Sequence, residues 1–368
     1  MSNKNASLLD PSLREAAAYD PFVRGRFPVG VTTFQASDNL RNRLFPCEVW
    51  YPAAAHLAAQ DLQANTQDRF IPRLDTTEQR QSALRDAAAH AGTYPLIIFS
   101  HHSGGHRRTS TFLCTHLSSH GYIVAGLDHS EVTAPELARA QNETEQQKNL
   151  RWQAAIESRV PDTRFLIDQM LRSDVWNACA EIDRNQVGLV GHSFGAWTTL
   201  ATPESDRRIK AVVALAPAGT SNPRPGILPV KLKFQWGRVV PVLYLAAEND
   251  VPLPLAGMYE LFDRAPEPKQ LVILRHADHM HFVDAVEQAH EGFRIMTPVP
   301  PELADMQKEM IPIAQLSSGA HAHLWIRGLT LAHMDAFLKD LRDAKQFLVG
   351  DIEAELATRG VEVILHRP

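Results

Sequence analysis

Cysteine is scarce in this chain of 368 residues, and its three cysteines stand far apart. Cys47, Cys114 and Cys179 are too few for a disulfide framework and lack the paired spacing of a zinc site, so we expect three buried free thiols. No long block of like charge occurs and the net charge is only −5, which excludes the basic footprint of a nucleic-acid-binding protein. The expected partner is therefore a small molecule.

A targeting segment and a long apolar run are also missing. Residues 1–28 form a polar leader without the basic start and apolar core of a signal peptide, and no uncharged stretch is long enough to span a bilayer. We therefore expect a cytoplasmic protein without a transmembrane segment. The length exceeds that of most single domains, but α/β folds reach it with loop insertions, so we predict one domain over 1–368.

Short apolar runs alternate with helical patterns from residue 95 onward, which is the main signal of the fold. Upstream, 29–38 and 45–53 are rich in β-branched or aromatic residues and predict a hairpin. The later strand candidates lie at 95–100, 122–129, 186–191, 209–217, 240–247 and 269–276. Strands that alternate with helices predict an α/β fold with a mostly parallel central sheet and helices on both faces.

Four other segments complete the predicted organisation. Residues 53–93 lack a clear period and are interpreted as a surface insertion. A helix is predicted over 161–174, opened by Pro161 and Asp162. An insertion at 294–320 precedes a closing helical extension at 323–345, in which Gly328 would allow a close approach to a neighbour.

The stretch GHSFG, residues 191–195, has the pattern of a nucleophile elbow. A serine hydroxyl is a weak nucleophile and needs a position clear of the backbone, a nearby base and donors for the oxyanion that forms. The elbow supplies the first requirement, because its serine sits in a strained turn between strand and helix with small residues on both sides. The apolar strand before Ser193 and the helix-compatible AWTTLAT after it fit this context.

An acid and a base follow the serine in the required order. Asp250 comes after the predicted strand at 240–247, and His279 follows the strand at 269–276. We predict that His279 is the base and that Asp250 accepts its Nδ1 proton, which leaves Nε2 facing Ser193. Neighbouring residues that could replace them are Glu248 for the acid, and His276 or His281 for the base.

The loop after the strand at 95–100 is the candidate for the oxyanion hole. One donor is expected from the N–H of Phe194 and the second from Ser103, in the loop HHSGGH. The alternative is that Gly104 and Gly105 only open the following helix. Candidate pocket residues are His102, Gly104 and Trp236.

These motifs resemble those of the α/β-hydrolases related to platelet-activating factor acetylhydrolase, and more distantly those of dienelactone hydrolases and cutinase-like polyester hydrolases. The resemblance runs from about residue 29 to 282 and includes VWYPA, YPLIIFSHHSGG, SSHGYIVAGLDH, GHSFGA, END and ADHMHF in this order. It implies an α/β-hydrolase fold, the triad Ser193, Asp250 and His279, and backbone oxyanion donors at Ser103 and Phe194. The sequence departs from the pattern at His102 and Ala196, where the family commonly has glycine.

The predicted function is a cofactor-free serine hydrolase that cleaves a carboxylic ester through an acyl-enzyme. The same triad could instead act on an amide, a lactone or a diketone carbon–carbon bond, because pocket shape decides this choice. A remote alternative is a non-catalytic hydrolase-like binding protein, which would show a damaged triad. No metal is expected, since neither histidine cluster, 276/279/281 or 101/102/106, has the spacing of a helix-borne zinc site.

Residues 218–240 form a candidate lid loop over the site. Its part at 222–239 contains Arg224, Lys231, Lys233 and Arg238 but no acid. A local positive charge of this kind favours a substrate that carries a carboxylate or phosphate, although a solvated loop face would look the same.

Overall fold

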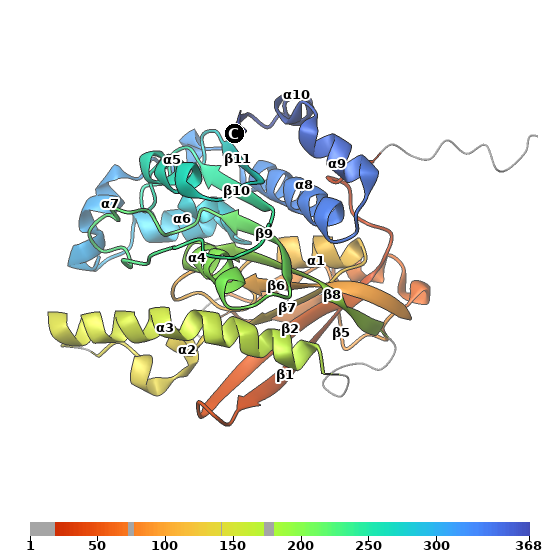
Figure 1. The fold of residues 1–368 in the computed structure, drawn as a ribbon, viewed down its shortest axis with the longest axis horizontal. Coiled ribbons are helices and arrows are strands. Elements are labelled where there is room, and N and C mark those ends of the chain that lie inside the picture. Colours follow the sequence, from red (N-terminus) through yellow and green to blue (C-terminus); the bar gives the residue numbers. More distant parts are fainter. Residues whose placement is uncertain (1–18, 73–76, 141, 173–179) are drawn as a thin grey trace, which may run out of the picture.

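The computed structural model describes residues 19–72, 77–140, 142–172 and 180–368 (Figure 1). Within them, one large sheet contains ten strands. These are β1 (Val29–Asp38), β2 (Arg43–Pro52), β5 (Leu84–Arg85), β6 (Gly92–Ser100), β7 (Ile123–Leu127), β8 (Ala180–His192), β9 (Ile209–Leu215), β10 (Val242–Ala247), β11 (Lys269–Leu274) and β12 (Val363–His366). Their order in space is β12-β11-β10-β9-β8-β6-β7-β2-β1-β5.

The middle of the sheet, from β7 to β11, is parallel, as the alternating pattern predicted. β2 pairs antiparallel with β7, and β12 pairs antiparallel with β11. The predicted hairpin is confirmed, because β1 and β2 pair antiparallel with Val29 opposite Pro52. Since the carboxyl ends of parallel strands lie on one edge of a sheet, the loops after β6, β8, β10 and β11 gather there.

Helices cover both faces of the sheet, and each face has its own apolar cluster. In β6, Leu96 and Ile98 join the cluster that contains residues of α3, α4 and α5, whereas Ile97 and Phe99 join the cluster of α1, α8 and α10. The helices are α1 (Thr111–Ser119), α2 (Ser130–Thr133), α3 (Glu145–Met170), α4 (Phe194–Ala201), α5 (Leu255–Arg264), α6 (Val286–Arg294), α7 (Ala304–Glu309), α8 (Gly319–Phe337), α9 (Arg342–Val349) and α10 (Ile352–Ala357). None of the described helices is both long and apolar enough to cross a membrane.

The helix predicted to open at Pro161 begins much earlier, so this prediction was wrong. α3 starts at Glu145, where Thr144 accepts from the N–H of Gln147 and the Gln147 side chain bonds back in a capping box. Pro161 lies inside the helix. The first half of α3 is polar, and apolar periodicity therefore did not reveal it, although the spacing Thr-x-x-Gln is a helix-start signal.

The closing helix ends sooner than predicted, and the chain after it returns to the sheet. α8 stops at Phe337, and α9 and α10 then lead to β12, the edge strand beside β11, which was not predicted. The prediction for Gly328 is confirmed, because a Cβ at this position would stand 2.2 Å from the ring of Phe22.

The segment 53–93 differs in part from a simple surface insertion. β3 (Asp68–Phe70) and β4 (Gln79–Gln81) form a small antiparallel sheet, and β5 pairs with β1 in the main sheet.

Cys47 and Cys114 are buried free thiols, as expected. Cys179 and residues 1–18 of the predicted leader lie outside the described residues.

Candidate active site

Ser193 occupies a strained turn between β8 and α4. Its backbone has φ 59° and ψ −115°, a combination that side-chain-bearing residues rarely adopt. Both flanking positions require glycine, because neither leaves room for a Cβ atom. A Cβ on Gly191 would lie 2.4 Å from the carbonyl oxygen of Gly195, and a Cβ on Gly195 would lie 2.0 Å from that of Ser100. The turn therefore lifts the Ser193 hydroxyl off the end of β8, which is the geometry of a nucleophile elbow.

Loops after β8, β10 and β11 bring Ser193, Asp250 and His279 together at one edge of the sheet. His279 Nε2 lies 2.9 Å from Ser193 Oγ, and His279 Nδ1 lies 2.7 Å from Asp250 Oδ2. The second carboxylate oxygen of Asp250 accepts the N–H of Leu253 at 2.7 Å. Asp250 and His279 are both buried. The three side chains thus form a continuous hydrogen-bonded chain from a buried carboxylate to a hydroxyl.

Burial and the paired charges set the protonation of this chain. Burial raises the pKa of Asp250. His279 and the Leu253 N–H lower this pKa, but they offset the effect of burial only in part. Burial alone would lower the pKa of His279, but the charge of Asp250 and its hydrogen bond outweigh that effect. The pKa of His279 therefore lies above its ordinary value, and the site stabilises the imidazolium that forms when the histidine takes a proton.

The rival residues have other partners. The Glu248 carboxylate accepts the N–H of His276 and lies near Arg275. His281 lies 2.8 Å from Asp278 through Nδ1 and donates from Nε2 to the carbonyl of Ser317. Over the described part of the chain, no group of three or more His, Cys, Asp or Glu side chains is arranged to hold a metal ion.

Two backbone N–H groups belong to residues that line the same cavity as Ser193. They belong to Ser103, in the loop after β6, and to Phe194, at the first position of α4, and both residues line this cavity with Ser193 and His279. Within the described residues, neither N–H donates a hydrogen bond to the backbone or to a side chain. Donors without a partner are what an oxyanion hole needs, so Ser103 and Phe194 remain the candidates for it.

Comparison with known proteins shows a likeness to one group of acetylhydrolases. The family model described as "Platelet-activating factor acetylhydrolase, isoform II" matches residues 20–172, a segment that ends before Ser193. A platelet-activating factor acetylhydrolase of Cavia porcellus is 25% identical over 222 residues, which cover 52% of this chain and 48% of that protein. One from Bos taurus is 27% identical over 223 residues, with the same two shares, 52% and 48%. The chain spans about half the length of these curated relatives.

A solved structure extends the likeness to nearly the whole chain. A ferulic acid esterase from Streptomyces cinnamoneus superposes with a TM-score of 0.61 and 22% identity, and the alignment covers 96% of this chain and 98% of that one. The protein has the α/β-hydrolase fold. In this fold the chain order of a triad is serine, then acid, then histidine, and Ser193, Asp250 and His279 follow β8, β10 and β11 in that order.

The candidate active site opens into a cavity of about 290 Å³. Ser193 and His279 lie on its polar side, together with His102, one of the predicted pocket residues. Much of the remaining wall is apolar and comes from Trp152, Ile227, Leu228, Leu253, Met280, Phe293 and Leu303. Part of the segment predicted as a lid loop, 226–228, therefore contributes directly to the wall.

Two predicted pocket residues do not line this cavity. Trp236 is buried in the apolar core and donates from Nε1 to the carbonyl of Leu200, so its ring is used for packing. Gly104 has φ 64° and stands beside open space rather than in the cavity wall. Its positive φ lets the loop turn after Ser103.

Three residues in or beside the candidate active site were not predicted. Trp152 and Arg159 come from α3, whose start was placed too late. Trp152 lines the cavity and Arg159 donates to the carbonyl of His101, and both placements depend on tertiary packing. His192 precedes the serine, and its buried ring packs 4.8 Å from that of His279. Burial, with the nearby His279 and His102, holds the pKa of His192 well below its usual range, so it remains neutral. The second position of the G-x-S-x-G motif was the only available signal for it.

The basic residues of segment 222–239 are engaged to different degrees. Arg224 forms a bidentate ion pair with Glu309, and Arg238 donates to the carbonyls of Pro203, Asp206 and Ile209. Lys231 and Lys233 have no ion pair within the described residues and extend from the loop between β9 and β10. Only these two lysines therefore remain as candidates for attracting an anionic substrate.

Proposed function

We propose that the protein is a serine hydrolase that cleaves carboxylic esters of small molecules, with Ser193 as nucleophile, His279 as base and Asp250 as its partner. The observation that carries this proposal is the unbroken chain from Asp250 Oδ2 through His279 to Ser193 Oγ, with links of 2.7 and 2.9 Å. The likeness to platelet-activating factor acetylhydrolases supports an ester as the substrate.

The geometry allows the following sequence of steps. His279 Nε2 accepts the proton of Ser193 as Oγ attacks the ester carbonyl carbon, and the carbonyl oxygen becomes an anion. The N–H groups of Phe194 and Ser103 donate to that oxygen. As the ester C–O bond breaks, His279 returns its proton to the leaving alcohol and an acyl-enzyme remains. Water then attacks in the same way and releases the acid, which restores the Ser193 hydroxyl.

The cavity favours short and medium acyl groups. The cavity has a volume of about 290 Å³ and its wall is largely apolar. We therefore expect turnover to rise and then fall along a series of p-nitrophenyl esters from acetate to palmitate, because a long chain would have to extend beyond the cavity.

The same ester series tests the proposed function. Ser193→Ala should reduce hydrolysis at every chain length by several orders of magnitude. Ser205→Ala, a change just after α4 and away from the cavity, should retain wild-type rates. Equal activity of Ser193→Ala and wild type would refute the assignment. Hydrolysis of matched amides or lactones at higher kcat/KM than the esters would replace the ester by that substrate class.

The two free lysines of the loop support an anionic ester as the finer substrate class. Lys231 and Lys233 lie in the same segment as the wall residues Ile227 and Leu228, and their charges would attract a carboxylate or phosphate on the substrate. The double change to alanine should raise KM several-fold for an anionic ester and leave KM unchanged for a neutral ester of the same size. Equal changes for both esters would contradict an anionic substrate.

A further inference from the structure

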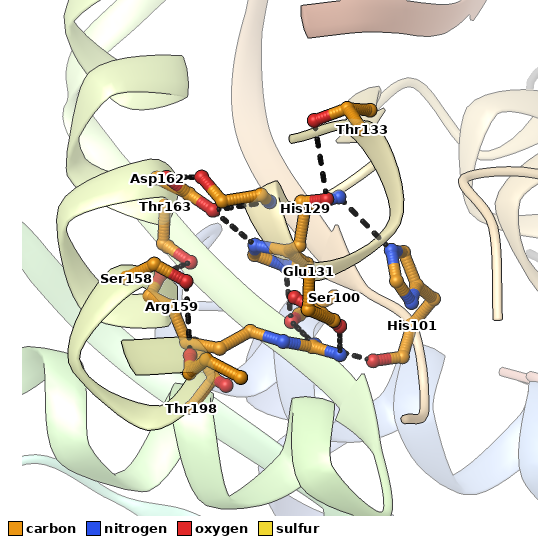
Figure 2. A network of polar contacts seen from close by, with 12 residues as sticks. Ser100, His101, His129, Glu131, Thr133, Ser158, Arg159, Asp162, Thr163 and Thr198 are labelled. Carbon is orange, nitrogen blue, oxygen red and sulfur yellow. Dashed lines mark hydrogen bonds and ion pairs between the residues drawn. The ribbon is translucent and has the colours of Figure 1, made fainter. Parts of the chain in front are cut away.

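Arg159 is a charged side chain with no exposure to solvent. It lies in the middle of α3 and has a relative exposure of 0%. Burying a guanidinium costs free energy unless its donors and its charge are matched. Its counter-charge is Glu131, with which it forms a close ion pair (Figure 2). The other contacts of Arg159 show what the buried charge holds in place.

Two of these contacts fix the loop after β6. Arg159 Nη1 donates to the carbonyl oxygen of His101 at 2.6 Å, and Nη2 donates to that of His102 at 3.2 Å. Figure 2 shows the first of these bonds, with Arg159 extended from α3 toward the end of β6. One rigid, planar group therefore grips two consecutive carbonyls, a geometry that a lysine ammonium cannot reproduce.

The direction of these carbonyls determines the direction of the next N–H groups. The peptide bonds that join His101, His102 and Ser103 are trans. In a trans peptide the carbonyl and the following N–H point in opposite directions. Because the His102 carbonyl points to Arg159, the N–H of Ser103 points away from Arg159, and Ser103 lines the cavity that contains Ser193.

Arg159 also contacts the residue that carries the second donor. Its guanidinium carbon lies 4.2 Å from the ring centroid of Phe194, within the range of a cation–π interaction. The N–H of Phe194 is the other donor of the proposed oxyanion hole. One buried cation thus holds both halves of the hole, one through backbone carbonyls and one through an aromatic ring.

A polar network fixes the loop from its other side. His129 Nε2 lies 2.9 Å from Ser100 Oγ, and the N–H of His129 donates to His101 Nε2 at 3.1 Å. Asp162, one turn after Arg159 on α3, accepts the N–H of Ser130 at 2.8 Å. The network attaches the ends of β6 and β7 to α3, so that Arg159 acts from a fixed position.

We propose that Arg159 is a positioning residue that sets the oxyanion hole, by holding the His101 and His102 carbonyls away from the cavity and the Phe194 ring against α3. The proposal rests on the proposed esterase function. Arg159 lines no part of the cavity, so its effect reaches the substrate through the loop after β6 and through Phe194. A hole set in this way stabilises the tetrahedral intermediate more than the bound ester.

The test compares Arg159→Met and Arg159→Lys with a matched control, Arg164→Met, which removes an exposed arginine from the same helix. For each variant, kcat and KM are measured with a p-nitrophenyl ester, and the inhibition constant with a trifluoromethyl ketone whose adduct places an oxyanion in the hole. A double variant, Arg159→Met with Glu131→Gln, removes the partner charge as well and guards against failure to fold. Each kcat is divided by the fraction of chains that a fluorophosphonate labels when the labelling reaction is complete, which gives kcat per labelled site.

The proposal predicts that Arg159→Met lowers kcat per labelled site by about 10²-fold, the lower end of the loss of one oxyanion donor. KM should change less than threefold. The inhibition constant of the ketone should increase by the same factor by which kcat/KM decreases. Arg159→Lys should recover part of the loss, and Arg164→Met should match wild type. A normal kcat per labelled site, with only a lower melting temperature or fewer labelled sites, would overturn the proposal. A wild-type protein that neither labels nor cleaves esters would instead overturn the proposed function, and the Arg159 proposal with it.

Discussion

Replacing Asp250 with asparagine should reverse the proton arrangement of His279. One oxygen of Asp250 accepts the N–H of Leu253 at 2.7 Å, and the other faces His279 Nδ1 at 2.7 Å. An asparagine of the same shape would keep its carbonyl oxygen on Leu253 and turn its NH₂ group to Nδ1. Nδ1 would then accept a hydrogen bond, and the proton would move to Nε2, the atom that faces Ser193. In this tautomer His279 cannot act as the base.

The expected loss follows from the role of the acid in a triad. Replacement of the aspartate by asparagine in a serine protease lowers kcat by about 10⁴-fold, because the histidine adopts the wrong tautomer. The same factor corresponds to roughly 5.5 kcal/mol of transition-state stabilisation. KM should stay within a small factor, because Asp250 lies behind His279 and is absent from the wall of the cavity.

The pH dependence gives a second readout. The carboxylate of Asp250 raises the pKa of His279, and His279 must be neutral to act as base. Wild-type kcat/KM should therefore rise with pH through a midpoint above the ordinary histidine value of 6.5. The residual activity of Asp250→Asn should also rise with pH, but through a midpoint at a lower pH than that of wild type. Glu248→Gln is the control and should leave the profile unchanged. Asp250→Asn with more than a tenth of wild-type kcat, or with an unmoved profile, would refute the reasoning.

Two further predictions concern stability. Gly328→Ala should lower the free energy of unfolding by about 1–3 kcal/mol in chemical denaturation, because its methyl group would meet the Phe22 ring at 2.2 Å; unchanged stability would contradict this contact. Burial alone would lower the pKa of His290, but its pairing with Asp278 raises the pKa above the ordinary value. The contribution of this pair to the free energy of unfolding is therefore complete below pH 6.5 and is lost as pH rises through the raised pKa. The stability advantage of wild type over His290→Gln should therefore shrink above neutral pH, and an advantage that grows would show the wrong sign.

Local patterns were sufficient for the parallel strands of the sheet centre and for the elbow. The parallel strands are buried on both faces, so each reads as a short apolar run, and the turn at Ser193 requires glycine on both sides because backbone atoms approach so closely. Asp250 and His279 could be placed because each follows such a run. The chain order of the site is thus a property of the sequence, whereas its distances come from the structure.

Other features depend on contacts that no local pattern carries. The first half of α3 is polar and shows no apolar face, so its start was missed and Trp152 and Arg159 with it. β12 is a short edge strand of four residues whose pairing with β11 is set by the helices before it. Trp236 was placed in the pocket because an aromatic residue in a loop can serve either role, and only packing decides between them.

The central claim is that Ser193 is an activated nucleophile, and covalent labelling tests it most directly. Wild type, Ser193→Ala and Ser205→Ala are treated with a fluorophosphonate, and intact mass is measured before peptide mapping. The account predicts one adduct per wild-type chain, located on Ser193, the same adduct on Ser205→Ala, and none on Ser193→Ala. Folded wild-type protein that remains unlabelled, or that is labelled at another residue, would contradict the account.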